Sequence, residues 1–233
     1  EQSAYLIEQI PITFYIRQLF SNQTEIRTRG DGKSVVYNDN LSQLKMDRTT
    51  NIITFFENKP GDETLLYTNN LTQTFTQMKR LGGWQLGMSF SSVDLSSNIV
   101  EYVRYVSSYP ILSSGREGMT QVKATTNGIE KLRTSSLIAQ TPLPTKNKKV
   151  TIVGGKDIVA ELLNEGFSMN EIEDIRIGYS WTTSSENNQI VEFIPTWYIK
   201  INNKWKTLSE LKADKKAGDA ANKQTVGGDG DGL

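Results

Sequence analysis

The sequence contains no cysteine and no histidine among its 233 residues. Without cysteine the chain has no disulfide bond, no thiolate metal ligand and no cysteine nucleophile. Without histidine it lacks the imidazole general base, the Ser-His-Asp triad and the commonest zinc ligand. Few enzymes do without both residues, so we expect a protein with no catalytic activity, no cofactor and no metal site.

A surplus of one charge is also missing. Lys and Arg together number 26, and Asp and Glu together number 26, so the formal net charge is zero. Nucleic-acid-binding proteins normally carry a basic surplus that displaces counterions from phosphates. The longest basic cluster here is the short stretch 146–149. We therefore expect no nucleic-acid partner.

Long apolar runs are missing as well. No stretch of about 18 consecutive apolar residues exists, so no segment is expected to span a bilayer. The chain begins at Glu1 rather than at Met, which is compatible with a signal or anchor sequence removed upstream. The hydrophobic content of 36% and the charged content of 22% are those of an ordinary globular protein. The length suits two small domains or one mid-sized domain.

Apolar residues recur at helical spacing in three segments. Pro11 suits the first turn of one helix, Gly82-Gly83 ends the second, and Gly166 ends the third. The predicted helices are 12–20, 71–81 and 157–165. β-branched and aromatic runs predict strands, and Asn127-Gly128 between two of these runs is the strongest hairpin signal. The predicted strands are 34–37, 52–56, 86–92, 98–109, 119–126, 129–137, 150–153, 175–183, 191–201 and 204–208.

Two segments that lie 91 residues apart (178 minus 87) resemble each other. Residues 87–102 and 178–193 align without a gap, and five of the sixteen positions are identical. Each segment predicts a strand, a polar turn and a strand, and each follows a predicted helix. We interpret this as a hairpin–helix–hairpin unit used twice; chance similarity in a Ser- and Thr-rich chain is the alternative. The predicted fold is α+β, with two similar small antiparallel-sheet units that each carry a helix on one face.

The expected domain boundary lies in the polar stretch 112–118. Residues 1–112 then contain the N-terminal helix and the first α+β repeat, and residues 113–212 contain the second repeat. Strands could still pair across this boundary. Residues 213–233 include five Gly and no aromatic residue, which is too little apolar surface to offset the entropy of ordering. We expect a disordered C-terminal tail there.

Two motifs invite a catalytic or binding interpretation. Residues 151–157 follow a strand and open a helix, as a phosphate-binding loop does. However, Val150 stands where the first Gly of that loop is needed, and Asp157 replaces its Ser or Thr. We interpret the segment as an ordinary helix entry. Glu101 and Glu192 occupy equivalent places in the two repeats, and we expect solvated or cross-strand-paired side chains rather than a catalytic pair.

Aromatic residues are the remaining candidates for function. The four Trp residues lie on or beside predicted strands, where most are expected in the core. Trp205 follows a tight turn and lies between Lys204 and Lys206, so we expect it to be partly exposed. An exposed Trp suits an interface anchor. We therefore name Trp205 and Tyr198 as candidate partner-interface residues.

Five segments of the chain match segments of a known family in type and in order. They are 14–20 (FYIRQLF), 82–84 (GGW), 109–111 (YPI), 172–179 (IEDIRIGY) and 194–200 (IPTWYIK). Each is a core or turn pattern, and their shared order makes the match specific. On these residues the chain resembles the YycH proteins over about residues 5–208.

The resemblance implies a location and a partner. The chain would be the central YycH-like and C-terminal YycI-like part of an extracytoplasmic protein. An N-terminal transmembrane helix outside this sequence would anchor that protein to the cell membrane. The implied function is non-enzymatic regulation of the sensor histidine kinase WalK (YycG), which controls cell-wall metabolism in Gram-positive bacteria. The related YycI would be a second partner, and the family offers no catalytic motif to transfer.

Other functions stay open beside this one. A cell-envelope ligand, either a wall polymer or a peptide, predicts a concave pocket with convergent polar groups, for instance between the repeats. A kinase regulator predicts an exposed apolar or aromatic patch outside the cores. An enzyme that uses carboxylates alone, as glycosidases do, has no support in the spacing of Asp and Glu.

Overall fold

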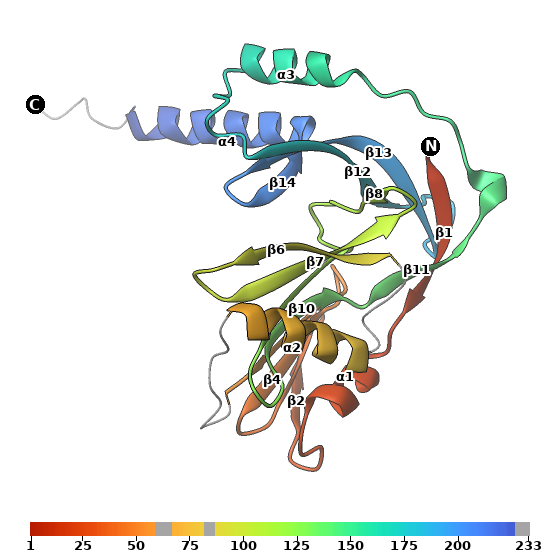
Figure 1. Ribbon diagram of the computed structural model, residues 1–233, viewed down its shortest axis with the longest axis vertical. Coiled ribbons are helices and arrows are strands. Elements are labelled where there is room, and N and C mark those ends of the chain that lie inside the picture. The colour runs from red at the N-terminus through yellow and green to blue at the C-terminus, as the bar shows by residue number, and fades with distance from the viewer. Residues whose placement is uncertain (59–66, 82–86, 227–233) are drawn as a thin grey trace, which may run out of the picture. The chain divides into compact units, whose positions relative to one another are not determined.

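The computed structural model of the chain describes residues 1–58, 67–81 and 87–226 (Figure 1). The chain divides into two compact units, and each is built from two stretches of sequence. Unit 1 comprises residues 1–149 and 179–194, and unit 2 comprises residues 150–178 and the residues from 195 onward. The predicted α+β class with antiparallel sheets is confirmed.

Unit 1 contains a nine-stranded antiparallel sheet. Eight of its strands follow one another in space, and the ninth, β8 (Tyr109–Pro110), pairs with β7. The spatial order is β2 (Arg27–Gly30), β3 (Ser34–Asn38), β4 (Ser42–Asp47), β5 (Ile52–Glu57), β10 (Ile129–Ser135), β9 (Met119–Ala124), β7 (Ile99–Val106) and β6 (Met88–Asp94).

Alternation along β5 shows how this sheet divides its two faces. Ile53 and Phe55 are 0% and 3% exposed, whereas Thr54 and Phe56 between and after them face solvent. The buried face lies under α1 (Ile12–Leu19) and α2 (Tyr67–Arg80), which cover the same side of the sheet (Figure 1). The core on this side includes Tyr15, Leu19, Leu44, Phe55, Met78, Val122 and Leu132.

A second sheet has five strands. Its order is β11 (Leu137–Pro142), β1 (Ser3–Gln9), β13 (Ile190–Ile201) and β12 (Asp174–Thr183), with β14 (Lys204–Thr207) also paired to β13. Residues 190–193 of β13 pair with β1, and residues 198–201 pair with β14. Pro195 lies between these two paired stretches, where a residue without an N–H group is tolerated.

The part of this sheet that belongs to unit 1 has an aromatic core. Phe193 is fully buried, and its ring centroid lies 5.3 Å from that of Tyr5, 5.8 Å from that of Tyr179 and 5.5 Å from that of Trp181. The pairs with Tyr5 and Trp181 are edge-to-face and the pair with Tyr179 is tilted, and such aromatic pairs add to the free energy gained from burial alone.

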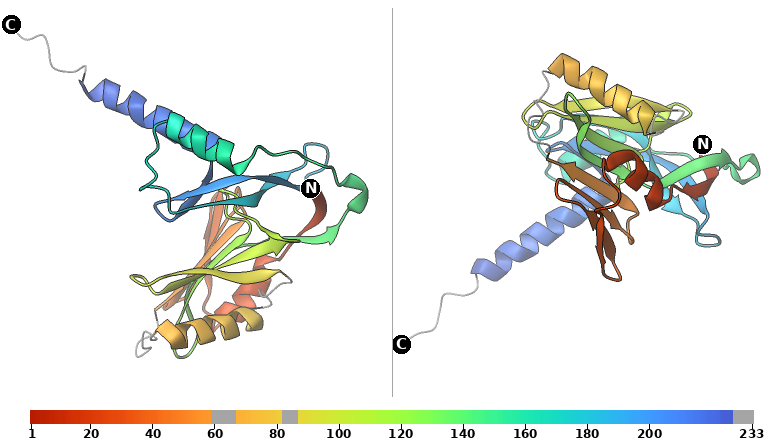
Figure 2. Two further views of the ribbon diagram at one scale, coloured as in Figure 1. Left: turned by 45° about the horizontal axis from the view of Figure 1, so that its top comes forward. Right: turned by 90° about the horizontal axis from the view of Figure 1, so that it is seen from below.

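Unit 2 carries α3 (Gly155–Asn164) and α4 (Leu208–Val226), which run side by side in Figure 1 and in the left view of Figure 2. Gly166 has a φ of +77° and ends α3, as predicted. The N–H of Phe167 bonds the carbonyl of Leu162 at 3.0 Å, and that of Gly166 bonds Leu163 at 2.9 Å. This is the Schellman arrangement, which satisfies the last carbonyls of a helix.

The strand pairing differs from the predicted repeat. The β9–β10 hairpin, which follows residues 112–118, joins β7 on one side and β5 on the other. The predicted boundary therefore runs through the nine-stranded sheet. The physical reason is that β5 and β7 would otherwise expose unpaired edges, and the two strands of this hairpin satisfy both.

The C-terminal segment begins with a helix. α4 continues through residues 213–226 of the predicted tail, and the remainder of that segment lies outside the described residues. Leu211 is the last buried apolar residue among those whose side chains are described. The helix continues because Ala and Lys, which are frequent here, have high intrinsic helix propensity.

Candidate interaction site

The turn that carries Trp205 is built by two consecutive asparagines in unit 2. Asn202 and Asn203 have φ values of 51° and 59°, which a tight hairpin turn of type I′ requires at both positions. The carboxylate of Glu173 accepts the N–H of Asn203 at 2.8 Å and holds the turn. The turn sets the register that places Trp205 directly opposite Lys200.

Tyr198 and Trp205 lie on the same face of this strand pair but differ in exposure. Trp205 is half-buried, in agreement with the expectation of partial exposure. Tyr198 is only 1% exposed, so in this structure it is a core residue and offers no surface to a partner. Ile199, which points to the other face, is also fully buried. β13 is therefore covered on both faces at this point. The alternation of residues along the sequence does not reveal this second covered face.

Arg176 contacts the indole of Trp205, and further charged residues pair nearby. The guanidinium carbon of Arg176 lies 4.7 Å from the ring centroid, which is a cation–π contact. Arg176 also pairs with Asp174, and Lys200 pairs with Glu173 at 3.4 Å. We call these five residues (Glu173, Asp174, Arg176, Lys200 and Trp205) the Trp205 cluster. It combines a large aromatic surface with both signs of charge.

An open groove lies in the same unit, between the loop after α3, the β13–β14 turn and α4. Its volume is about 770 Å³. Phe167 provides an apolar wall, and the ammonium group of Lys215 lies 5.2 Å from its ring centroid. Lys206 pairs with Asp214 across the groove. We call it the α4 groove; it is lined by Phe167, Asn170, Glu171, Glu173, Ile201, Lys204, Lys206, Leu211, Asp214 and Lys215, among others.

A charged clamp holds α3 and α4 together beside this groove. The ammonium group of Lys212 lies 2.7 Å from a carboxylate oxygen of Glu161 and 2.9 Å from one of Glu165. The bond from Lys212 lowers the pKa of Glu165, and the bonds to Glu161 and Glu165 raise the pKa of Lys212. Both groups therefore stay charged over a wide pH range.

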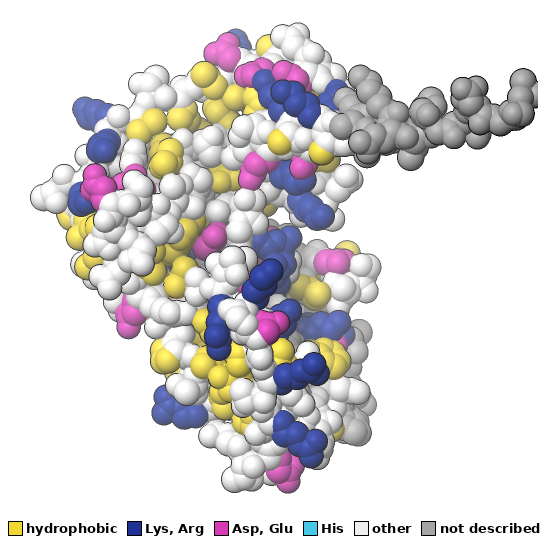
Figure 3. Space-filling model, turned by 180° about the vertical axis from the view of Figure 1, so that it is seen from behind, with side chains coloured by type: hydrophobic (Ala, Val, Ile, Leu, Met, Phe, Trp, Pro, Cys, Tyr) yellow, Lys and Arg dark blue, Asp and Glu magenta, His cyan; other side chains and the backbone are white. Residues whose placement is uncertain are grey.

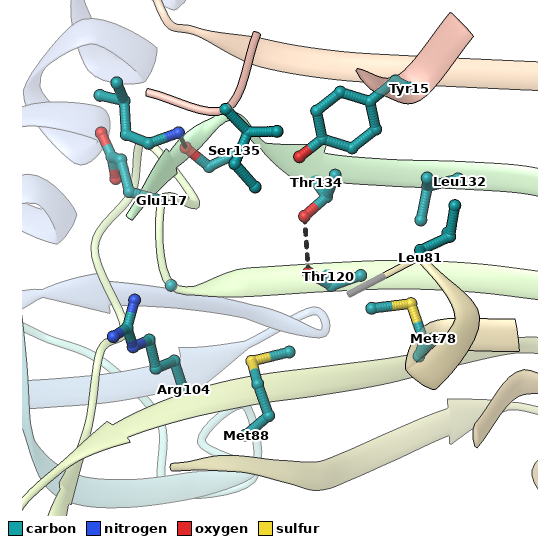
Figure 4. A pocket seen from close by; sticks show the side chains of 13 residues that line it. Tyr15, Met78, Leu81, Met88, Arg104, Glu117, Thr120, Leu132, Thr134 and Ser135 are labelled. Atoms are coloured by element: carbon teal, nitrogen blue, oxygen red, sulfur yellow. Dashed lines mark hydrogen bonds between the residues drawn. The ribbon is translucent and has the colours of Figure 1, made fainter. Parts of the chain in front are cut away.

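Unit 1 contains a small interior pocket that sequence analysis did not identify (Figure 4). Its volume is about 40 Å³, which is room for roughly three water molecules. Arg104 and Glu117 lie toward one end, and the hydroxyls of Thr120 and Thr134 bond each other at 2.8 Å along the wall (Figure 4). Burial raises the pKa of Tyr15 and lowers the pKa of Arg104. The other end is lined by Met78, Leu81 and Leu132.

This pocket is too small for a metabolite in the described conformation. One sequence signal could have identified it. Val100, Tyr102 and Arg104 alternate along β7 and share one face, and the first two are core residues, so a charged residue at position 104 places a polar group in the core. We interpret the pocket as a polar inclusion in the core of unit 1.

The two motifs considered for catalysis have structural roles. Residues 154 and 155 form the entry of α3, as expected for the segment 151–157. Glu101 accepts a bond from the cross-strand neighbour Gln121 at 3.0 Å, and Glu192 accepts one from Gln2 at 2.8 Å. Cross-strand pairing of these carboxylates was the expected outcome.

Two negative findings concern only the part of the chain that the structure describes. Within it, no group of three or more acidic side chains is arranged to hold a metal ion. Over the same residues, no helix combines the length and the apolar character needed to cross a bilayer.

The fold is similar to that of two solved proteins. YycH from Bacillus subtilis superposes with a TM-score of 0.67 at 16% identity, covering 89% of this chain and 52% of that protein. An uncharacterized protein from Eubacterium rectale superposes with a TM-score of 0.53 at 8% identity, covering 89% of this chain and 81% of that protein. This chain thus spans about half of the B. subtilis protein. Among curated proteins, none matches the sequence.

The family assignment comes from the sequence and covers most of the chain. The model of the YycH protein C-terminal domain matches residues 1–215, which include both sheets, the Trp205 cluster and the α4 groove. The chain belongs to the family of YycH C-terminal domains.

Proposed function

We propose that this chain is part of an extracytoplasmic regulator of the sensor histidine kinase WalK (YycG) and acts by protein–protein contact together with YycI. The observation that carries the proposal is family membership over residues 1–215. The proposal includes a non-enzymatic mechanism. It also includes an N-terminal transmembrane anchor, outside this sequence, that holds the chain at the outer face of the membrane.

The surface of unit 2 supports a binding function. Trp205 presents a half-buried aromatic ring, and Arg176 stacks against it. Trp and Arg are the residue types most enriched among the residues that dominate binding energy at protein interfaces. The Trp205 cluster therefore suits the centre of a contact with the kinase or with YycI.

Regulation of a kinase requires little from such a contact. A regulator shifts an equilibrium between active and inactive states only if it binds one state more tightly than the other. A difference of about 3 kcal/mol in binding free energy changes the ratio of the two states by about 150-fold. One well-packed aromatic anchor can supply a difference of this size.

The test is a binding measurement with a matched control. The purified chain is titrated with the extracytoplasmic region of WalK and, separately, with that of YycI. We expect Trp205→Ala to weaken binding by about 30-fold, which is the loss of about 2 kcal/mol typical of a central anchor. Phe90→Ala serves as the control, because Phe90 is an aromatic residue of unit 1 that is 47% exposed.

The outcomes separate the site from the function. Equal loss in both variants would show that the Trp205 cluster is not the contact. Absence of binding of the unmodified chain to either protein, alone or combined, would contradict the proposed partners. A change in autophosphorylation of WalK in proteoliposomes on adding the chain would support regulation directly.

A second candidate function rests on the α4 groove. Its volume of about 770 Å³ and its mixed lining of Phe167, Lys206 and Glu173 suit a peptide or a wall-polymer fragment. Calorimetric titration with peptidoglycan-derived peptides tests it. Binding that Phe167→Ala abolishes would favour an envelope ligand, whereas absence of heat with the unmodified chain would contradict it.

A further inference from the structure

The outer face of the nine-stranded sheet, opposite α1 and α2, carries a row of cations. The strand register places Arg29 opposite Val36, Val36 opposite Lys45, Lys45 opposite Thr54 and Thr54 opposite Arg133. Residues that are directly opposite in a sheet point to the same face. Positive side chains therefore occupy every second strand along a line from β2 to β10.

The adjacent line repeats this pattern in part. Arg27 opens it on β2, and Phe56 and Lys131 stand opposite each other at its other end. The ammonium group of Lys131 lies 5.9 Å from the ring centroid of Phe56, which is 46% exposed. We call the five cations Arg27, Arg29, Lys45, Lys131 and Arg133 the basic strip. Figure 3 shows Lys and Arg side chains gathered on this side of the molecule.

Acidic residues neutralise the strip only in part. Glu57 at the end of β5 is buried, and Glu130 lies 2.8 Å from the ammonium group of Lys123 on the neighbouring strand and 4.0 Å from that of Lys131 in the strip. Among the described residues, Lys45 and Arg133 form no ion pair within 4.0 Å. Burial lowers the pKa of Arg133, and the like charge of Arg116 lowers it further. All five cations of the strip are exposed.

Carboxylates instead border the strip at both ends of the strands. Asp31 and Asp47 lie in the turns at one end, and Asp39 lies in the turn at the other end. Backbone N–H groups of the two turns lower the pKa of Asp31 and of Asp47, so both carboxylates remain ionised. The positive region is therefore long across the strands and narrow along them.

This shape favours one class of ligand. The strip has five charges of one sign in two lines, and a ligand with a regular row of negative charges complements this arrangement. A flat anionic bilayer would bring its headgroups against the bordering carboxylates as well as the cations. A linear polyanion lying across the strands would contact the cations alone. The distance from β2 to β10 is four strand spacings, or about 19 Å.

We propose that the basic strip binds an extended phosphodiester polymer that runs perpendicular to the strands. Cations on every second strand recur at about 10 Å, a spacing that flexible Lys and Arg side chains adjust to phosphates of different repeat lengths. The zero net charge of the whole chain does not exclude this, because the opposite charges are segregated. This site lies in unit 1 and is independent of the proposed kinase contact in unit 2.

The test uses fluorescently labelled poly(glycerol phosphate) and the full chain, with anisotropy as the readout. Log affinity should fall linearly with log salt concentration, because each neutralised phosphate releases counterions. Lys45→Gln combined with Arg133→Gln should weaken binding at low salt by about tenfold or more. It should also reduce the salt slope by about 1.4, or roughly 0.7 for each cation lost.

The control removes the same charge elsewhere. Lys149→Gln combined with Lys156→Gln alters two exposed cations outside the strip and outside the α4 groove, and we expect affinity within about twofold of the unmodified chain. Circular dichroism of both double variants verifies folding. Equal loss in the two double variants would overturn the proposal, since net charge alone would then explain binding.

Two further probes distinguish the ligand class. Monomeric glycerol phosphate should compete only at far higher phosphate concentration than the polymer; equal competition would indicate a single-anion site and overturn the proposal. Vesicles that contain phosphatidylglycerol should bind more weakly than the polymer at equal phosphate concentration. Tighter binding to vesicles would identify a membrane contact instead.

Discussion

Unit 1 and unit 2 hold helices against a sheet by different means. In unit 1, α2 is fixed by buried hydrogen bonds as well as by apolar contacts. Asn70 of α2 is fully buried and donates to the carbonyl of Asn98 at 2.9 Å, and its own carbonyl accepts the N–H of Ala124 at 3.3 Å. The hydroxyl of Thr74 lies 2.8 Å from that of Tyr102.

In unit 2, the described contacts of α4 are apolar at its first turn and ionic after it. Leu211 is buried in the core, Leu208 packs against the same core, and Lys212 supplies the ion pairs to α3. Exposed ion pairs contribute little to stability, whereas broken buried hydrogen bonds leave costly unpaired groups. We therefore expect unit 1 to be the rigid scaffold and α4 to be displaced more easily than α2. The α4 groove lies beside that element, so a ligand there would meet an adaptable wall.

The largest effect is expected from opening the core of unit 1. Phe55 is 3% exposed and its ring centroid lies 5.9 Å from that of Phe20, which joins the sheet to the segment after α1. Phe55→Ala should lower the free energy of unfolding by about 3–5 kcal/mol. Chemical denaturation measures this loss. A loss below about 1 kcal/mol would show that the core relaxes and that unit 1 is not the rigid scaffold described above.

A smaller and more local effect is expected in unit 2. Leu211 is 5% exposed, and Leu211→Ala should cost about 2–3 kcal/mol, at the low end for a buried leucine because α4 can shift inward. Hydrogen exchange should show faster exchange in α4 with little change in the nine-stranded sheet. Equal acceleration in both units would contradict the separate behaviour of α4.

Each unit has one glycine with positive φ, among the described residues, whose replacement by Ala tests how closely other atoms surround it. A Cβ atom at Gly87, where φ is +87°, would lie 2.4 Å from the carbonyl oxygen of Tyr105. A Cβ atom at Gly166, where φ is +77°, would meet only the flexible end of Lys215 at 2.9 Å. Gly87→Ala should therefore cost about 2–3 kcal/mol and Gly166→Ala about 1 kcal/mol.

Thermal denaturation of these variants provides the measurement. Gly32→Ala is the control, because no atom lies within 4 Å of a Cβ placed there. A cost for Gly166→Ala equal to that for Gly87→Ala would show that Gly166 at the end of α3 is as tightly enclosed as Gly87.

Elements whose signals are local could be predicted from the sequence. Pro11 and Gly166 mark helix ends, and Asn127-Gly128 marks a hairpin, because each acts through the backbone of its own neighbours. β1 was missed: its pairing with β13 joins residues about 190 positions apart, and no local signal specifies that partner. Pairing of strands across residues 112–118 was left open for the same reason, and β9 and β10 do join the strands that precede this stretch.

The candidate site shows the same limit. The flanking lysines of Trp205 indicated partial exposure because they are local. The burial of Tyr198 depends on the elements that cover β13. Alternation of apolar and polar residues along that strand predicts one buried face, whereas both faces are buried at this point. The basic strip was not identified, because Arg29, Lys45 and Arg133 are far apart in sequence and meet only through strand register.

The smallest expected effects concern acid pH, and they distinguish the units by the cause of the pKa shift. In unit 1, bonds from the hydroxyls of Ser96 and Ser97 lower the pKa of Asp94 to about 2. In unit 2, the bond from Lys212 lowers the pKa of Glu165. A depressed native pKa gives stability that is present above the unfolded pKa and is lost as pH falls through the native one.

For Asp94 the loss therefore falls between about pH 4 and pH 2, and it should be insensitive to salt because neutral donors cause the shift. For Glu165 the loss begins below its ordinary pKa of 4.5 and should shrink at high salt, since a screened ammonium group causes it. Amide NMR signals of the β6–β7 turn and of α3, followed from pH 5 to pH 2 at two salt concentrations, measure both. Asp94→Asn should reduce the pH dependence of the amide signals in the β6–β7 turn and leave that of α3 unchanged. If high salt weakened the acid response of both regions equally, the two pKa shifts would share an electrostatic cause. The distinction between a hydrogen-bonded turn in unit 1 and an ion-paired helix pair in unit 2 would then be contradicted.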